Sequence, residues 1–585
     1  MVKRAISNIT NVMVRKQTEI VSVASMLIVI GLATKVLGLI FNALAAGYLG
    51  TTAYNSFIFA SALPELASQV ILFGAISASV LPVLTGVLDK HGSQRFSKVF
   101  SSLINISLVL FTVSAVLIGI FAHDLLPWFI ETVIQPKEEI KNIGELGDML
   151  RVLMIPQVIL GISVYLSTAL NIYERFLVPQ LAPLFYNVGR ILAIFLLIPF
   201  MGNNPWVLVI GTIVGSVIHL AVQIPVVLHL GVRYQLVADF KDKYIRKIGL
   251  VAAPRIAAIS GDQLRITIDK FIAFGLVNNS LALYNLAILI ISVPLSVFGV
   301  SFATASFPSL AKAFNNNDRI LASQIFYKVV NQIIFFSVPA AVLLLVLRVP
   351  ISRMAFGVFG EEIGFLETYT IAWVILFFAP GIVFESLRTV IYRAFYAAHD
   401  TIRPLVISIG VLIFGTILGV LFTNYLSNFD TFALQSLSFD FSYFFSKESG
   451  GAAVGGLALR SSVIFTLEAL VLMYWLNRTY LHARWGEVMG PILRKITAGG
   501  VMLLFSYLVY KIWAGLEDTE RTVYLILLTG TTTAASLMIY LGVSWALRVP
   551  EVKGFIEFLI KYPNLKAFRR FRNFDPIPED PELMK

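Results

Sequence analysis

Five ionisable side chains lie on one otherwise apolar stretch, residues 248–276: Arg255, Asp262, Arg265, Asp269 and Lys270. A stretch of this length can cross a bilayer as a helix, which takes about 20 residues. At about 100° per residue, the first four side chains fall within an arc of roughly 80° on one helix face. Charged groups at membrane depth are costly unless they face a partner or a water-filled cavity. The spacing therefore predicts a charged stripe that faces a polar interior.

Two interpretations of this stripe follow from its spacing. Asp262 and Arg265 are three residues apart, and Arg265 and Asp269 are four apart. Side chains at these spacings meet on a helix, so the carboxylates and the guanidinium group can neutralise one another. The stripe is then either a self-satisfied network that only holds helices together, or the lining of a cavity that handles a charged solute. We favour the cavity.

Further charges interrupt other apolar spans. Lys35 lies in the middle of the first span, too deep for its ammonium group to reach the interface easily, so we assign it to the same cavity. Glu385 and Arg388 are three residues apart, and an internal ion pair and a place in the cavity wall are both open. Arg460 and Glu468 share roughly one face of a later span, and we assign them no role.

Four cations stand at the predicted centre: Lys35, Arg255, Arg265 and Lys270. Guanidinium and ammonium groups bind phosphate oxygens well. The residue types therefore favour an anionic headgroup, such as a phosphate or a pyrophosphate, as the solute.

The composition predicts a membrane protein with many spans. Of 585 residues, 57% are hydrophobic and only 14% are charged. The absence of cysteine excludes disulfides and thiolate metal sites. The sequence has no nucleotide-binding loop, nucleophile elbow or zinc-protease motif, so we expect a transporter rather than an enzyme, with no cofactor. Transport would then be passive, or coupled to the membrane potential or to a monovalent ion.

The pattern of apolar spans predicts an all-α membrane protein of about fourteen transmembrane helices. These form two pseudo-symmetric six-helix lobes and two further C-terminal helices. The expected parts are a cytoplasmic N-terminus (1–20), an N-lobe (21–232), a cytoplasmic linker (233–246), a C-lobe (247–477) with an outward loop (427–451), the C-terminal helix pair (488–547) and a basic cytoplasmic tail (548–585).

An internal repeat supports the two lobes, since three residues of the second span recur in the eighth: Tyr54, Asn55 and Pro64 as Tyr284, Asn285 and Pro294. The common offset of about 230 residues covers six helices, so both copies have the same orientation and a site is expected between them. Lysine and arginine gather in alternate loops, which predicts that both termini are cytoplasmic. The net charge of +11 is explained by these loops, and we expect no nucleic-acid partner.

Several stretches resemble the MurJ-type (MviN) lipid II flippases of the multidrug/oligosaccharidyl-lipid/polysaccharide exporter superfamily. They include TKVLGLIFNALAAGYLG (34–50), NIYERFLVPQLAPLFYN (171–187), PLSVFGVSFATASFPSLAKAF (294–314) and, most specific, RAFYAAHDTIRP (393–404). The resemblance implies a bacterial inner-membrane protein with fourteen helices, whose last two flank a groove for a lipid tail. It also implies that undecaprenyl-pyrophosphate-linked peptidoglycan precursor moves from the inner to the outer leaflet by alternating access.

The sequence departs from the family pattern at its cavity charges. Two arginines of the first helix are Lys35 and Phe41 here, and an aspartate at the start of the second helix is Asn55. Other family charges are replaced by Ser68, Gln69, Phe73, Ile288 and Leu289. We infer that the cavity charge has moved to the seventh helix. The candidate substrate-binding residues are Lys35, Asn55, Arg255, Asp262, Arg265, Asp269, Lys270, Glu385 and Arg388.

Two alternatives to lipid II transport stay open. One is a flippase for another lipid-linked oligosaccharide, and the other is a transport-inactive scaffold that binds cell-wall synthesis proteins. The missing family charges support the scaffold, whereas the basic residues of the predicted cavity argue against a drug/sodium antiporter. The expected partners are a lipid-linked glycan and membrane lipids, with cell-wall synthesis proteins as a further expectation.

Overall fold

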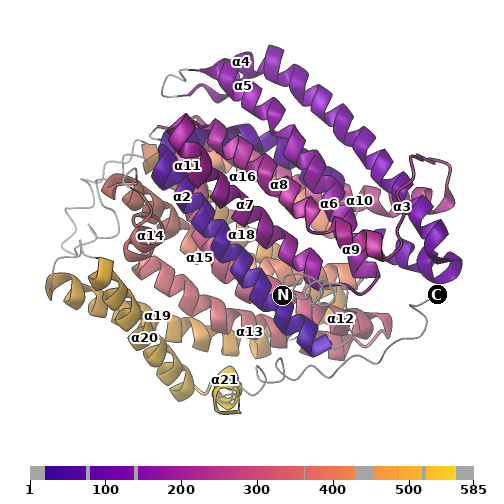
Figure 1. Ribbon diagram of the computed structural model, residues 1–585. Coiled ribbons are helices and arrows are strands. Elements are labelled where there is room, and N and C mark those ends of the chain that lie inside the picture. Colours follow the sequence, from indigo (N-terminus) through magenta and orange to yellow (C-terminus); the bar gives the residue numbers. More distant parts are fainter. Residues whose placement is uncertain are drawn as a thin grey trace, which may run out of the picture.

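The structure is a computed structural model that describes residues 20–73, 80–136, 142–277, 279–360, 363–427, 452–483, 485–516 and 522–561. Every regular element in these ranges is helical (Figure 1). Helices are expected in a bilayer, because they satisfy their own backbone hydrogen bonds where water is absent. Most of the predicted N-terminus, outward loop and basic tail lies outside the described residues.

The N-lobe contains the helices that precede residue 230. They are α2 (Ile20–Ser68), α3 (Leu81–Ile120), α4 (Leu126–Trp128), α5 (Ile143–Val152), α6 (Met154–Ile172), α7 (Leu177–Met201), α8 (Trp206–Ala221) and α9 (Ile224–His229). Helix α2 is two helices joined at Gly50, whose φ of 86° a glycine adopts without strain. A π-helical segment, η1 (Gln69–Phe73), extends its second half beyond Pro64.

The C-lobe begins with the helix that carries the charged stripe. Its helices are α10 (Lys243–Phe274), α11 (Ser280–Pro294), α12 (Ser301–Asn315), α13 (Arg319–Val346), α14 (Arg348–Phe356), α15 (Phe365–Ala397), α16 (Ile402–Ser427) and α18 (Gly455–Leu476). The π-helical segment η5 (Leu295–Val300) joins α11 to α12 directly after Pro294. The C-terminal helices are α19 (Trp485–Leu516), α20 (Thr522–Ala546) and α21 (Pro550–Lys561).

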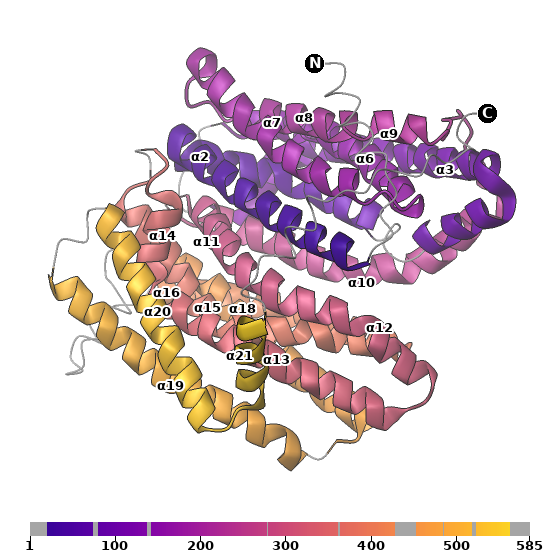
Figure 2. The same cartoon turned by 60° about the horizontal axis from the view of Figure 1, so that its bottom comes forward.

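The two predicted lobes are separate groups of helices in Figure 2. Helix α10 lies between them, since it contacts α2 and α3 of the N-lobe as well as α11 and α16. Helices α19 and α20 pack outside the C-lobe, against α13 and α14. This arrangement confirms the predicted fold class and places the charged stripe at the junction of the lobes.

Twelve helices in the described ranges are long and apolar enough to span a membrane. This number counts α2 as one span, although α2 contains two helices. It leaves out α10, because charged residues interrupt the apolar sequence of that helix. The count of fourteen therefore stays a prediction.

Candidate functional site

The charged stripe of α10 is tied into pairs along its own helix. The Arg265 guanidinium group lies 4.0 Å from an Asp262 carboxylate oxygen and 3.4 Å from an Asp269 oxygen. These are the pairs that the spacing predicts. The backbone of Arg255 continues the same helix, but its side chain lies outside the described residues.

Helix α15 adds a second guanidinium group to this stripe. Arg388 forms a two-pronged pair with Glu385, at 2.7 and 2.8 Å, which confirms the ion-pair interpretation of their spacing. Its Nη1 atom also lies 3.2 Å from Asp262 of α10. The pair is therefore both an internal ion pair and a link between two helices.

Helix α18 contributes two charged groups that the sequence analysis left without a role. Arg460 is only 1% exposed and contacts Asp269. The Glu468 side chain is fully buried, lies 3.5 Å from Arg388 and accepts a 2.5 Å hydrogen bond from the Tyr392 hydroxyl group. Their spacing on one face of an apolar helix was the available signal, because buried charges are expected to have partners.

The seven groups form one connected set, which we call the C-lobe ion cluster: Asp262, Arg265, Asp269, Glu385, Arg388, Arg460 and Glu468. It holds four carboxylates and three guanidinium groups. Arg265, one of the four cations assigned to an anionic headgroup, is thus paired with the two carboxylates of its own helix that the spacing predicts. The partners from α15 and α18 could not be predicted, because a sequence shows the charges along one helix but not those that neighbouring helices bring to it.

Lys270 also has a partner, on the opposite lobe. Its ammonium group lies 2.6 Å from the Glu65 carboxylate of α2, a residue that the sequence analysis did not single out. Glu65 is 45% exposed by its side chain, whereas Lys270 is largely buried. This ion pair connects the two lobes, so it must break if they separate here.

Lys35 contrasts with the other cations of the predicted site. It is exposed, and its ammonium group reaches from α2 to the Ser296 hydroxyl group of η5 on the other lobe. No carboxylate of the described residues lies within ion-pairing distance of it. Lys35 is thus a cation at the lobe junction that is available for an anionic ligand.

Arg190 of α7 is another cation in the described residues that has no carboxylate partner. Its guanidinium carbon lies 3.4 Å from the centre of the Phe41 ring and 5.0 Å from that of Tyr186. Such stacking partly compensates a cation for lost water without cancelling its charge. The sequence analysis did not choose Arg190, because a lone arginine in an apolar span gives no sign of its surroundings.

A polar seam joins the lobes near the Gly50 bend of α2. The Asn55 side-chain oxygen accepts a 3.0 Å hydrogen bond from the backbone N–H of Ala282. The Tyr54 hydroxyl group accepts a 2.6 Å hydrogen bond from Asn285, which is the counterpart of Asn55 in the internal repeat. The Asn279 amide donates to Thr51 and Thr52, at 3.2 and 3.0 Å. Asn55 therefore holds the lobes together in this structure.

Two glycines allow the seam to close tightly. A Cβ atom at Gly47 would lie 1.4 Å from the Phe359 carbonyl oxygen, and one at Gly360 would lie 2.1 Å from the Gly47 carbonyl oxygen. Gly360 also has a φ of 96°, which favours glycine. Any side chain at Gly47 would therefore force the N-lobe away from the segment after α14.

The fold and these contacts define a multi-pass helical transporter with two lobes, an ion cluster inside one lobe and a seam at the junction. The family description "Lipid II flippase MurJ" matches residues 45–493. The chain therefore belongs to the MurJ lipid II flippase family, as its sequence motifs suggested, and this is a family of membrane transporters rather than enzymes.

Two known proteins agree with this assignment over two thirds of this chain or more. A probable lipid II flippase MurJ of Haemophilus influenzae is 25% identical over 539 residues, covering 88% of this chain and 98% of its own. A probable lipid II flippase MurJ of Vibrio cholerae is 25% identical over 403 residues, or 67% and 75% of the two chains.

Solved structures support the fold. The structure described as "Lipid II flippase MurJ, inward closed conformation" has a TM-score of 0.66 at 18% identity and covers 88% of this chain and 98% of its own. An inward-facing transporter of the MATE family, in the MOP superfamily, has a TM-score of 0.58 at 13% identity, with 76% and 93% covered.

Proposed function

We propose that this chain moves lipid II, the undecaprenyl-pyrophosphate-linked peptidoglycan precursor, from the inner to the outer leaflet of a bacterial cytoplasmic membrane. The observation that carries the proposal is Lys35, an exposed cation at the lobe junction that has no carboxylate partner in the part of the chain that the structure describes. Membership of the MurJ family supports the choice of substrate. Lys35 takes the pyrophosphate, and Arg190 contributes a second positive charge from within the N-lobe.

The division of charge between the lobes assigns them different tasks. The C-lobe ion cluster has partners for its guanidinium groups, so releasing one to bind phosphate would leave a buried carboxylate uncompensated. We therefore place phosphate binding on the N-lobe side of the junction. Arg265, Arg388 and Lys270 then act on the arrangement of the helices rather than on the substrate directly.

The seam suggests which state of the transport cycle the structure represents. Its hydrogen bonds lie at the Gly50 bend and at the connection between α10 and α11. The distribution of lysine and arginine predicts that this end of the helices faces away from the cytoplasm. With both termini cytoplasmic, the lobes are closed toward the outside. Transport then requires the seam and the Lys270–Glu65 pair to open as the lobes rock.

The energy source in this proposal is the membrane potential or a monovalent cation. A cation that moves with the lobes responds to the potential by about 2.3 kcal/mol per charge per 100 mV. The C-lobe ion cluster also has four carboxylates and only three guanidinium groups. A bound monovalent cation or proton would neutralise the remaining negative charge.

Growth rescue of a bacterium depleted of its own lipid II flippase tests the role of Lys35. We expect Lys35→Ala to abolish rescue and Lys35→Arg to retain it, because arginine keeps the charge and binds phosphate. Lys312→Ala, an exposed lysine at the end of α12, is the matched control and should rescue fully. Membrane levels of each variant are compared by immunoblot.

The same strain separates transport from a scaffold role. A transport-inactive scaffold that binds cell-wall synthesis proteins would not rescue this strain, because the strain lacks lipid II transport. Failure of the wild-type chain, despite correct insertion, would therefore favour the scaffold or a flippase for a different lipid-linked oligosaccharide. Normal growth of Lys35→Ala at wild-type abundance would contradict the role proposed for Lys35.

A further inference from the structure

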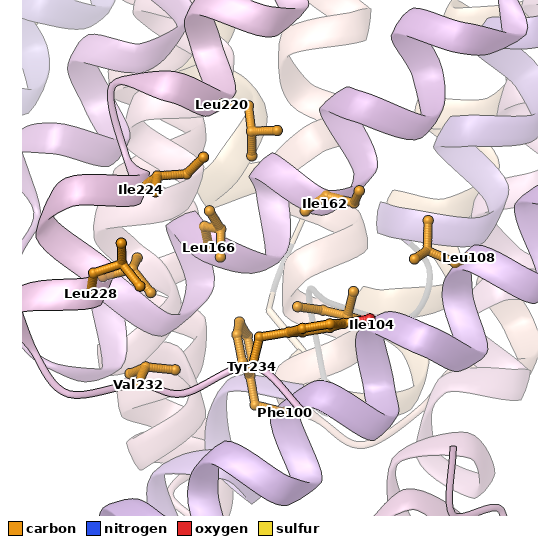
Figure 3. A pocket seen from close by; sticks show the side chains of 11 residues that line it. Phe100, Ile104, Leu108, Ile162, Leu166, Leu220, Ile224, Leu228, Val232 and Tyr234 are labelled. Carbon is orange, nitrogen blue, oxygen red and sulfur yellow. The ribbon is translucent and has the colours of Figure 1, made fainter. Parts of the chain in front are cut away.

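The N-lobe contains an apolar pocket of about 290 Å³ between α3, α6, α8 and α9 (Figure 3). Its wall includes Ile104, Ile162, Leu166, Leu220, Leu228 and Tyr234. Leu228 is 64% exposed and Tyr234 is 57% exposed, so the pocket opens at the surface. All of its lining residues belong to the N-lobe or to the segment that follows α9. The pocket is therefore separate from the seam and from the C-lobe ion cluster.

The pocket is closed on one side by a segment that we call the strap, residues 232–241. Side chains of α3 hold its backbone in place. The Asn105 amide donates to the carbonyl oxygens of Gln235 and Val237, at 3.1 and 2.8 Å, and Ser101 accepts from the Gln235 N–H group at 2.9 Å. Asn105 also accepts a 2.5 Å hydrogen bond from the Tyr234 hydroxyl group, the polar atom of the pocket wall. The wall is therefore fixed and leaves a ligand little to bind except by apolar contact.

The outer side of the strap combines apolar and basic side chains. Leu236 is 89% exposed and Phe240 is 58% exposed, which is unfavourable in water but not in a bilayer interface. Five exposed basic residues follow from the same segment into the start of α10: Arg233, Lys241, Lys243, Arg246 and Lys247. The segment 232–247 contains only two acidic residues, Asp239 and Asp242. The Asp242 carboxylate already forms an ion pair with Arg95 at 2.6 Å.

We propose that this pocket binds one acyl chain of an anionic phospholipid, whose phosphate lies against the basic residues of the strap. The apolar wall suits a hydrocarbon chain, and the positive surplus beside its opening suits an anionic headgroup. The polyprenyl tail of a transported lipid fits less well, because neither the C-lobe nor α19 and α20 contribute a lining residue. The site is separate from the proposed transport site at Lys35.

Lipid retention by the purified full-length chain tests the proposal. The chain is placed in mixed micelles with phosphatidylglycerol or with phosphatidylcholine of the same acyl chains, and bound lipid is counted by native mass spectrometry. Phosphatidylglycerol should be retained preferentially. Arg233→Gln and Lys241→Gln should each weaken its retention by about fivefold, because a basic residue near an anionic headgroup contributes about 1 kcal/mol. Leu166→Trp, which fills the pocket, should remove this bound lipid.

Two matched controls lie on the other lobe. Lys312→Gln removes an exposed charge from α12, and Ile413→Trp adds an indole ring to the exposed surface of α16, so both should retain the lipid as the unchanged chain does. A phosphatidylglycerol with a photoreactive acyl chain should cross-link to α3, α6 or α9 in the unchanged chain, which tests the site even if Leu166→Trp misfolds. Equal retention of both phospholipids, cross-links spread evenly over both lobes, or displacement of phosphatidylglycerol by undecaprenyl phosphate would overturn the proposal.

Discussion

At the scale of single residues, the partners of a charge decide its role more than its depth in the membrane does. Arg265 and Lys35 both interrupt apolar spans. Arg265 is held between Asp262 and Asp269, whereas Lys35 is exposed and, among the described residues, donates its hydrogen bond to the Ser296 hydroxyl group. Breaking a buried pair costs more than its formation gains, since the remaining charge stays buried. The paired groups therefore stabilise one helix arrangement. Lys35 has no carboxylate partner among the described residues, which is why we propose it for binding the substrate.

The Arg460–Asp269 contact gives a prediction for stability at this scale. Both side chains are almost fully buried, so Arg460→Met should lower the free energy of unfolding by about 3 to 5 kcal/mol. The double variant Arg460→Met/Asp269→Asn should recover much of this loss, because it removes both charges. The free energies of unfolding of the single and the double variant are measured in detergent from the fluorescence of the tryptophans. A double variant less stable than Arg460→Met would show that the pair is not the source of the effect.

At the scale of elements, periodicity and the internal repeat predicted most of the architecture. The apolar spans, the two lobes and the repeat that relates Tyr54 and Asn55 to Tyr284 and Asn285 could be predicted from one chain, because each is a regular pattern in sequence. A π-helical segment also follows the repeated proline in each lobe: η1 begins five residues after Pro64, and η5 begins directly after Pro294. A proline removes one backbone hydrogen bond, so these places can change shape at low cost.

The pairing between elements could not be read in the same way. Glu65 lies 205 residues before Lys270, and Asp269 lies 191 residues before Arg460. Nothing in a single sequence specifies that these helices adjoin, so the charged stripe was predicted without its partners on other helices. The role of Arg190 was left open for the same reason, since its stacking on Phe41 depends on how α7 packs against α2.

The close approach of Gly47 to Phe359 leads to a prediction about the seam. Gly47→Val should push α2 away from the segment after α14 and shift the lobes toward the state that is open on this side. The substitutions Thr51→Cys and Asn279→Cys place one cysteine on each side of the seam, so their cross-linking reports on the distance between the lobes there. The chain has no native cysteine that could react instead.

Cross-linking of this cysteine pair by a short bismaleimide measures the effect. It should be efficient in the background with Gly47 intact and fall several-fold when valine is added. A control substitution, Ile413→Val on the exposed surface of α16, should leave the yield unchanged. An undiminished yield with Gly47→Val would mean that this close approach does not hold the seam closed.

At the scale of the whole molecule, the structure separates three functions. The seam and the Lys270–Glu65 pair hold the lobes closed at one end, the C-lobe ion cluster fixes the helices of one lobe, and Lys35 presents positive charge between the lobes. Two lobes that rock about a junction can expose one cation first to one leaflet and then to the other. Movement of a lipid headgroup needs only this change of access, since its tail stays in the bilayer.

Appearance of labelled lipid II in the outer leaflet is the most direct measurement of this account. Cells depleted of their own flippase are given this chain, and outer-leaflet lipid II is quantified with a probe that does not enter the cell. We predict that the unchanged chain and Lys35→Arg restore the signal, and that Lys35→Ala at equal abundance leaves it at the depleted level. Full restoration by Lys35→Ala would contradict the account.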